Sequence, residues 1–132
     1  MEDVDDMRQD PAKPATPPPG QVGALAEDAA WNYLQRQGLH LVQRNYRVRG
    51  GEIDIIARDP RDVLVFVEVR ARASTAFGGA AASVDARKRA RILLAARHYL
   101  MRLPAEVACR FDVVAIDGGQ LHWIRDAFDA DG

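Results

Sequence analysis

The chain has 132 residues, of which 48% are hydrophobic and 28% are charged, so it can bury an ordinary core within a single domain. No apolar stretch approaches the roughly 20 residues of a membrane span, and the acidic, proline-rich start does not resemble a signal peptide. The single cysteine, Cys109, excludes an internal disulfide and is expected to be a buried small hydrophobe. Together these features indicate a cytoplasmic protein without a membrane partner.

Charge is unevenly distributed, although the formal net charge is only -1. The first 20 residues carry five acids and two bases, whereas residues 36–102 carry 14 bases and six acids, a net charge of +8. A basic middle region favours a polyanionic partner such as nucleic acid. A solvated, arginine-rich surface has the same composition, so charge alone leaves both interpretations open.

Residues 1–20 have the composition of a disordered tail. They contain five of the seven prolines and no aromatic residue, which is too little apolar surface to offset the entropy lost on ordering. We therefore expect the folded domain to occupy residues 21–132.

Seven elements are predicted within that domain. Apolar residues recur at helical spacing from residue 22 to a stop signal at Gly38, and again from residue 84 to Pro104, with Ser83 as the expected N-cap. Runs rich in β-branched residues predict the strands, at residues 39–50, 52–57, 63–70, 108–116 and 121–124. Residues 76–83 are expected to form a loop.

This order of elements predicts an α/β fold in which helices flank a mixed central sheet. The three consecutive strands imply a meander. The strand at residues 108–116 has a nearly continuous apolar run, which is typical of a buried strand, and it could pair in parallel after the second helix.

Three carboxylates interrupt the apolar strands of the meander: Glu52, Asp54 and Glu68. Buried carboxylates are costly unless something pairs with them. If the hairpin loop comprises residues 60–62, Asp54 lies opposite Glu68 on the same face of adjacent strands. A loop one residue longer would place Val67 opposite Asp54 and separate the two acids.

Two interpretations of the facing acids are open. Asp54 and Glu68 could form salt bridges with nearby arginines such as Arg47, Arg49 or Arg70. Alternatively, a divalent cation between them would remove their repulsion, and Mg²⁺ commonly uses one or two carboxylates. The spacing of an aspartate, a hairpin and then a Glu-x-basic triplet favours the metal site.

These residues lie in segments that resemble a known family. The segments are GALAEDAAWNYLQRQG, RNYRVRGGEIDIIARD, LVFVEVRAR, FGGAAASVDARKRARILLAARHYL and RFDVVAI, and they span nearly all of residues 22–116. They resemble the bacterial YraN family, which is regarded as a group of nucleases in the PD-(D/E)XK superfamily, similar to archaeal Holliday junction resolvases. The resemblance implies a restriction-endonuclease-like fold with an αβββαβ core, the order that the pattern also predicts.

The resemblance implies roles for individual residues. Asp54 and Glu68 match the acids that bind Mg²⁺ or Mn²⁺, and Glu27 matches an acid that often completes the site. Arg70 stands where lysine is usual; an arginine keeps its charge but does not accept a proton, so only electrostatic help is expected of it. Lys88 matches a family lysine, which makes Asp54, Glu68, Arg70 and Lys88 the expected catalytic residues. From the residues alone, Glu27 and Lys88 could equally be solvated helix side chains.

Two further features precede the acids. Gly50 and Gly51 are expected to allow a bend or a close approach of two backbones. Glu52 matches the GEID pattern of the family and is interpreted as an outer ligand or as a partner for an arginine.

The second helix carries a basic stripe. Its members recur at three- and four-residue spacing, and they are Val84, Lys88, Arg91, Ala95, His98 and Arg102. A separate apolar stripe is expected at Ala86, Ala90, Leu93, Leu94 and Leu100. The basic stripe favours contacts of Arg91, His98 and Arg102 with a nucleic-acid backbone, although a plain exposed helix would look the same.

The leading hypothesis is an Mg²⁺- or Mn²⁺-dependent endonuclease that hydrolyses DNA phosphodiester bonds, with branched DNA as one candidate substrate. The resemblance to resolvases implies a homodimer, which no residue of the sequence itself indicates. The alternative is a non-catalytic nucleic-acid-binding or interaction module that keeps the fold, and Arg70 is the strongest argument for it. RNA is not excluded as the nucleic acid.

Overall fold

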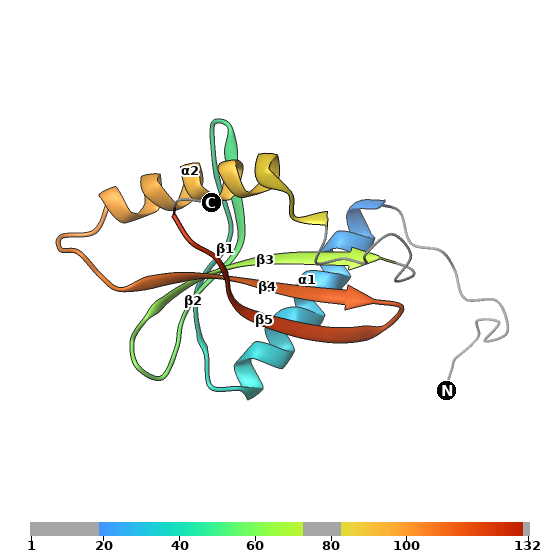
Figure 1. Cartoon of the computed structure of the whole chain (residues 1–132). Coiled ribbons are helices and arrows are strands. Elements are labelled where there is room, and N and C mark those ends of the chain that lie inside the picture. Colours follow the sequence, from blue (N-terminus) through green and yellow to red (C-terminus); the bar gives the residue numbers. More distant parts are fainter. Residues whose placement is uncertain (1–18, 73–82, 131–132) are drawn as a thin grey trace, which may run out of the picture.

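The computed structural model describes residues 19–72 and 83–130, which form two helices and five strands (Figure 1). In chain order these are α1 (Pro19–Arg36), β1 (His40–Val48), β2 (Gly51–Arg58), β3 (Leu64–Arg72), α2 (Ala86–Met101), β4 (Cys109–Asp117) and β5 (Gln120–Phe128). The predicted order of elements is confirmed. Most of the expected tail and of the expected loop lies outside the described residues, and α1 begins two residues before the expected domain boundary.

The strands form one mixed sheet in the order β1-β2-β3-β4-β5. β3 and β4 are parallel, and all other neighbours are antiparallel. A parallel pair cannot be joined by a tight turn, so the chain crosses over between β3 and β4 through α2. This confirms an α/β fold with a mixed sheet and helices against it.

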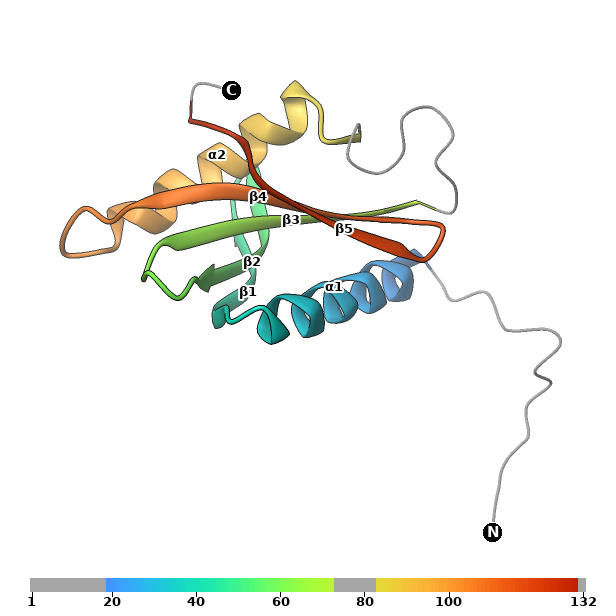
Figure 2. The same ribbon diagram turned by 60° about the horizontal axis from the view of Figure 1, so that its bottom comes forward.

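The two helices cover opposite faces of the sheet (Figure 2). On one face, Leu34 of α1 packs in a cluster with Val65 of β3. On the other face, Ile92 and Tyr99 of α2 pack in a cluster with Phe66. Because alternate residues of β3 enter the two clusters, this strand is buried on both sides and has a continuous apolar sequence.

The β2–β3 hairpin has the shorter of the two loops considered for it. Ile55 pairs with Val67, and the ladder closes around residues 60–62. Continued by one residue, this register sets Asp54 opposite Glu68. The predicted hairpin register is therefore confirmed up to Ile55 and Val67, the last paired residues of this ladder.

α2 departs from the prediction at its start and in its buried face. Its N-cap is Asp85 and not Ser83, since the Asp85 carboxylate accepts a hydrogen bond from the backbone N–H of Lys88 at 3.0 Å. Ala86 and Ala90 of the expected apolar stripe are exposed. The helix instead buries Ile92, Ala95, Ala96 and Tyr99. Two of these are alanines, so the buried face is narrow and lets α2 lie close to the sheet.

Two features of β4 and β5 also differ from the prediction. Cys109 is exposed, because it is the first residue of β4 and precedes the buried part of that strand. β5 continues to Phe128, beyond its predicted end. The carboxylate of the fully buried Asp112 accepts a hydrogen bond from the backbone N–H of Asp126 at 2.9 Å, which holds the end of β5 on β4.

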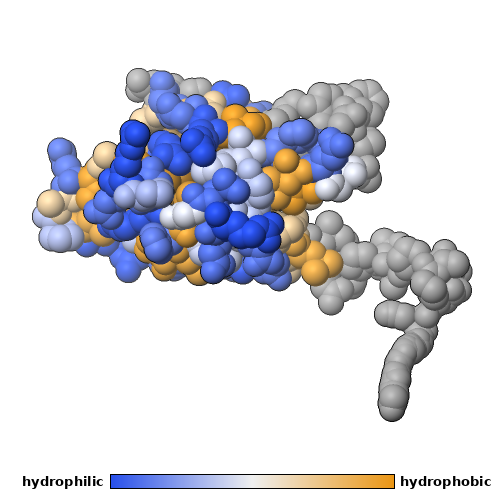
Figure 3. Space-filling view, turned by 90° about the horizontal axis from the view of Figure 1, so that it is seen from below, coloured by the Kyte–Doolittle hydropathy of each residue, from blue (hydrophilic) through white to orange (hydrophobic). Residues whose placement is uncertain are grey.

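On the face drawn in Figure 3, hydrophilic side chains predominate and apolar ones are scattered among them. The large exposed apolar residues, Leu25, Leu41, Val42 and Met101, come from α1, β1 and α2. Among the described residues, neither helix has the length and apolar character needed to cross a membrane.

Candidate functional site

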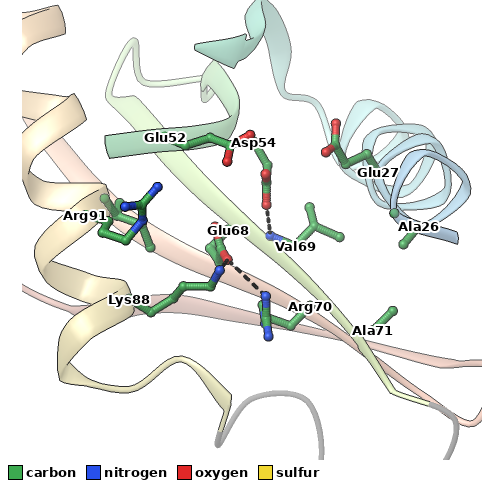
Figure 4. A pocket seen from close by; sticks show the side chains of 12 residues that line it. Ala26, Glu27, Glu52, Asp54, Glu68, Val69, Arg70, Ala71, Lys88 and Arg91 are labelled. Atoms are coloured by element: carbon green, nitrogen blue, oxygen red, sulfur yellow. Dashed lines mark hydrogen bonds and ion pairs between the residues drawn. The ribbon is translucent and has the colours of Figure 1, made fainter. Parts of the chain in front are cut away.

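A hollow of about 330 Å³ opens where α1 and α2 meet the start of β2 and the end of β3 (Figure 4). Its charged lining residues are Glu27, Glu52, Asp54, Glu68, Arg70, Lys88 and Arg91. In Figure 4, α1 flanks the acids on one side and α2 brings its two bases from the other. Four carboxylates and three bases thus face one small space, and all four elements are needed to assemble it.

The Asp54 carboxylate closes the end of the β2–β3 ladder. It accepts a hydrogen bond from the backbone N–H of Val69 at 2.8 Å, immediately beyond the last paired residues, Ile55 and Val67. A side chain thereby satisfies a β3 donor that has lost its backbone partner on β2. Burial raises the pKa of Asp54, and the hydrogen bond from Val69 opposes that rise.

β1 and β2 are irregular at the same point where the pairing of β2 with β3 ends. Ile53 and Ile56 both pack in the cluster beneath α2, although simple alternation would put them on opposite faces. Asn45, which lies opposite Asp54 in the β1–β2 register, has a φ of +54°, a left-handed conformation that asparagine tolerates better than most residues. The strands therefore twist apart at Asp54, which frees its carboxylate to reach Val69.

Glu68 is buried beside Asp54. Burial, the charge of Asp54 and a hydrogen bond between the two carboxyl groups raise the pKa of Glu68 to about 8. Lys88 and Arg70 oppose this rise, but their nearest nitrogen atoms lie 4.0 and 3.8 Å from Oε2 of Glu68, at the outer limit of an ion pair. The two acids therefore share a proton at neutral pH, and they are not closely paired with bases.

The other two acids contact β1. Glu27 accepts a long hydrogen bond from Nη2 of Arg44 at 3.4 Å, and Glu52 accepts a shorter one from Nε of Arg47 at 3.0 Å. Burial and then the charge of Asp54 raise the pKa of Glu27. Glu27 faces Asp54 from α1 (Figure 4), whereas Glu52 is the partner of an arginine, one of the two roles expected of it.

Gly51 allows α2 to approach the start of β2, as the sequence suggested. A Cβ atom at this position would lie 2.5 Å from the carbonyl oxygen of Arg91 and 3.0 Å from the backbone nitrogen of Ala95. Only glycine permits so close a contact between the two backbones. The contact sets the height of α2 above β2 and so places Lys88 and Arg91 beside the acids.

Arg70 is held by Ser83, which precedes α2. Nε of Arg70 donates a hydrogen bond to Oγ of Ser83 at 2.9 Å. The guanidinium is thereby fixed with Nη1 directed toward Glu68 (Figure 4). Ser83, which was expected to cap α2, instead positions Arg70.

The oxygen atoms of the hollow fit a hard divalent cation. Asp54 and Glu68 supply two carboxylates, and the proton that they share relieves the same repulsion that a cation would relieve. At about 30 Å³ for each water in the liquid, the hollow has room for several waters of hydration. Across residues 19–72 and 83–130, no group of three or more His, Cys, Asp or Glu side chains converges as metal ligands. The site is thus a pair of acids, with Glu27 at its rim.

The hollow contains most of the residues that the sequence singled out, namely Glu27, Asp54, Glu68, Arg70, Lys88 and Arg91. His98 and Arg102 do not line it, since they lie roughly 15 and 21 Å beyond Lys88 along α2 at 1.5 Å per residue. Arg102 instead stacks over the rings of Tyr46 and Tyr99 at 5.6 and 5.5 Å.

Two functional contacts were missed from the sequence. The backbone N–H of Val69 has no side-chain signature, so its bond with Asp54 could not be anticipated. Ser83 has the position and chemistry of an N-cap, and Asp85, two residues later, has the same signal. Only the structure decides between these two candidates.

The region that forms the hollow is similar to known proteins. The model of "Uncharacterised protein family UPF0102" matches residues 26–116, which include every residue of the hollow except Gly23. A UPF0102 protein of Cupriavidus metallidurans is 59% identical over 119 residues, 90% of this chain and 88% of the relative. One from Cupriavidus pinatubonensis is 58% identical over 109 residues, 83% of this chain and 86% of the relative. One from Burkholderia pseudomallei is 58% identical over 110 residues, 83% and 76% of the two chains.

Proposed function

The chain belongs to the UPF0102 family, and from the site enclosed by the matched region we propose that it is a metal-dependent endonuclease that hydrolyses DNA phosphodiester bonds. One observation supports this most: the half-buried Asp54 and the buried Glu68 face each other, and the pKa values of both are raised. Acids held in structural ion pairs have lowered pKa values. Acids with raised pKa values in a hollow are typical of functional sites.

The fold supports a more specific assignment within the same proposal. The αβββαβ order, the mixed sheet and the acids on β2 and β3 suit a restriction-endonuclease-like nuclease similar to Holliday junction resolvases. Branched DNA is then a candidate substrate, and a homodimer is the expected assembly because a junction has two symmetric cleavage positions. Analytical ultracentrifugation of the full chain tests the dimer.

Five of the charged residues would take part in the reaction, in two groups. Asp54 and Glu68 would hold Mg²⁺ or Mn²⁺, with Glu27 joining from the rim. A divalent cation held there would lower the pKa of water and stabilise negative charge on a phosphate. Arg70 and Lys88, on the other side of Glu68, would bind the non-bridging phosphate oxygens and stabilise charge that develops in the transition state.

The test is cleavage of plasmid, single-stranded and four-way junction DNA with Mg²⁺, Mn²⁺ or EDTA. We expect cleavage that requires the metal and is lost in Asp54→Asn and Glu68→Gln. Glu106→Gln is the matched control, because Glu106 is an exposed acid between α2 and β4 and should cleave like the wild type. Cleavage that survives in Glu68→Gln would contradict the proposal.

A second candidate function is supported by the geometry of Arg70. Arg70 stands where the resemblance to nucleases leads us to expect a lysine, and its guanidinium is fixed by Ser83, keeps its charge and cannot accept a proton. This favours a nucleic-acid-binding module without turnover. Binding of the same DNAs with no cleavage under any metal condition would select it over the enzyme.

A further inference from the structure

A second hollow adjoins the first one and has the opposite charge. Its lining residues are Arg70, Arg72, Ser83, Asp85, Arg87, Lys88 and Arg91. Arg70, Lys88 and Arg91 line both hollows. The acids thus gather on the α1 side of these three bases, and further bases gather on the other side.

Three of the five bases of this second hollow are available to a ligand. Arg72, Arg87 and Arg91 are exposed, and none of them forms an ion pair with another described residue. The single acid, Asp85, has its carboxylate bound to the N–H of Lys88 as the α2 cap. Within the described part of the chain, five positive charges therefore face the space against one negative charge that is already engaged.

The composition of this lining also limits what it can recognise. Among the residues that the structure describes, this lining contains no aromatic and no aliphatic side chain, so these residues offer no ring for a base to stack on and no apolar wall for a sugar face. Guanidinium groups match phosphate oxygens in a bidentate geometry. Phosphate contacts position a strand but do not read its sequence.

We propose that Arg72 and Arg87 form a phosphate subsite, which binds a phosphodiester of the same nucleic-acid strand next to the one at Asp54 and Glu68. This inference rests on the proposed function for its substrate class. It relocates the nucleic-acid contact from the middle and end of α2, where His98 and Arg102 were expected to bind, to the start of α2 and the end of β3. The strand then crosses the three shared bases to reach the acids.

The test is the affinity of the full chain for a labelled 20-nucleotide DNA in EDTA, measured by fluorescence anisotropy at several salt concentrations. Each phosphate contact contributes a salt slope of about 0.7 to 0.9, which is roughly fivefold in affinity at 0.15 M salt. We expect Arg72→Gln and Arg87→Gln each to weaken binding about fivefold and to reduce the slope by about one. Arg97→Gln is the matched control, because Arg97 is an exposed arginine on α2 about 15 Å beyond Arg87 and should bind like the wild type.

Two further arms separate the possible outcomes. DNAs of equal length and different base composition should bind equally, and an RNA of the same length shows whether the subsite distinguishes the sugar. An equal loss of affinity in Arg97→Gln, or no loss in Arg72→Gln and Arg87→Gln, would overturn the subsite. If Arg72→Gln and Arg87→Gln selectively lose binding and the wild type never cleaves, the result supports the subsite and contradicts the enzymatic function. A wild type that binds neither DNA nor RNA overturns both.

Discussion

Asp54 serves as the missing strand partner of Val69, whose backbone N–H it binds at 2.8 Å where β2 parts from β3. The same carboxylate faces Glu68. Loss of the charge and loss of the hydrogen-bond acceptor should therefore have different consequences, and two substitutions separate them.

Asp54→Asn keeps an acceptor oxygen for Val69 and removes the negative charge that helps to raise the pKa of Glu68. We expect an unchanged or slightly higher free energy of unfolding and no binding of Mg²⁺ or Mn²⁺. Asp54→Ala leaves the N–H of Val69 without an acceptor, which should cost about 1–3 kcal/mol. Urea unfolding and isothermal titration calorimetry measure the two effects. A loss of about 3–5 kcal/mol in Asp54→Asn would instead identify Asp54 as a buried salt-bridge partner.

The shared proton predicts how stability varies with pH. Glu68 has a pKa of about 8 in the folded protein against 4.5 as its ordinary value, so between these pH values the folded state binds more protons than the unfolded state. The free energy of unfolding must then fall as pH rises from about 4.5 to about 8, and level off above that range. Glu68→Gln should flatten this dependence in urea unfolding across pH 5–9. Glu106→Gln should keep the wild-type slope, and a slope that persists in Glu68→Gln would show that another group causes it.

Cation binding should release a proton. A divalent cation between Asp54 and Glu68 requires both carboxyl groups to be ionised, but at pH 7 Glu68 is still protonated. Titration of Mn²⁺ in buffers of different ionisation enthalpy should show about one proton released per ion at pH 7 and fewer at pH 9. Proton release that does not depend on pH would place the ion elsewhere.

Arg70 and Ser83 should act as one unit. Arg70→Ala should reduce the cleavage rate about 100-fold, the usual effect of losing one donor to developing charge, with a smaller effect on DNA affinity. Arg70→Lys should retain or raise the rate, because lysine keeps the charge near Glu68. Ser83→Ala should lower the rate in the wild type, where it frees the guanidinium, but not in the Arg70→Lys background, where Nε is already absent. Equal losses in both backgrounds would make Ser83 independent of Arg70.

Gly51→Ala should displace α2. Its Cβ would lie 2.5 Å from the carbonyl oxygen of Arg91, so the helix must move or the fold must strain, at a cost of about 1–3 kcal/mol. Gly23→Ala is the control, since a Cβ there would meet nothing within 4 Å and alanine favours a helix by about 0.5–1 kcal/mol. Thermal unfolding of both variants measures the difference. Equal stability of the two variants would mean that the backbones of Gly51 and Arg91 leave room for a Cβ atom.

The sequence predicted the parts of this site that depend on regular geometry. Strand alternation and a three-residue loop were enough to predict the hairpin register, which the four residue pairs from Ile55–Val67 to Arg58–Leu64 follow without a bulge and which brings Asp54 next to Glu68 at its end. The mixed sheet followed in the same way from the order of the elements. Gly51 could be anticipated as a close contact, although its partner on α2 could not.

The parts that were missed depend on irregular backbone or on competition between equal candidates. The left-handed Asn45 disturbs the alternation of faces beside Asp54, and no residue pattern marks it. On α2, Ala95 was assigned to the basic stripe because helical spacing identifies stripes but does not say which of two faces the core. The stripe that contains Ala95 faces the core because the small side chain of Ala95 lets α2 contact Gly51.

Asp54 both accepts the hydrogen bond of Val69 and faces Glu68, so an aspartate at this position in a relative is not by itself a sign of activity. Because it completes a hydrogen bond of the sheet, folding alone is a reason to keep an aspartate or asparagine at this position, even in a protein that has ceased to cleave. The opposite holds for Glu68. Its burial beside Asp54 lowers the stability of the folded state, so only a role in the reaction would be a reason to keep a glutamate there. In a diverging lineage, Glu68 should therefore be the first of the pair to be replaced once cleavage is no longer under selection.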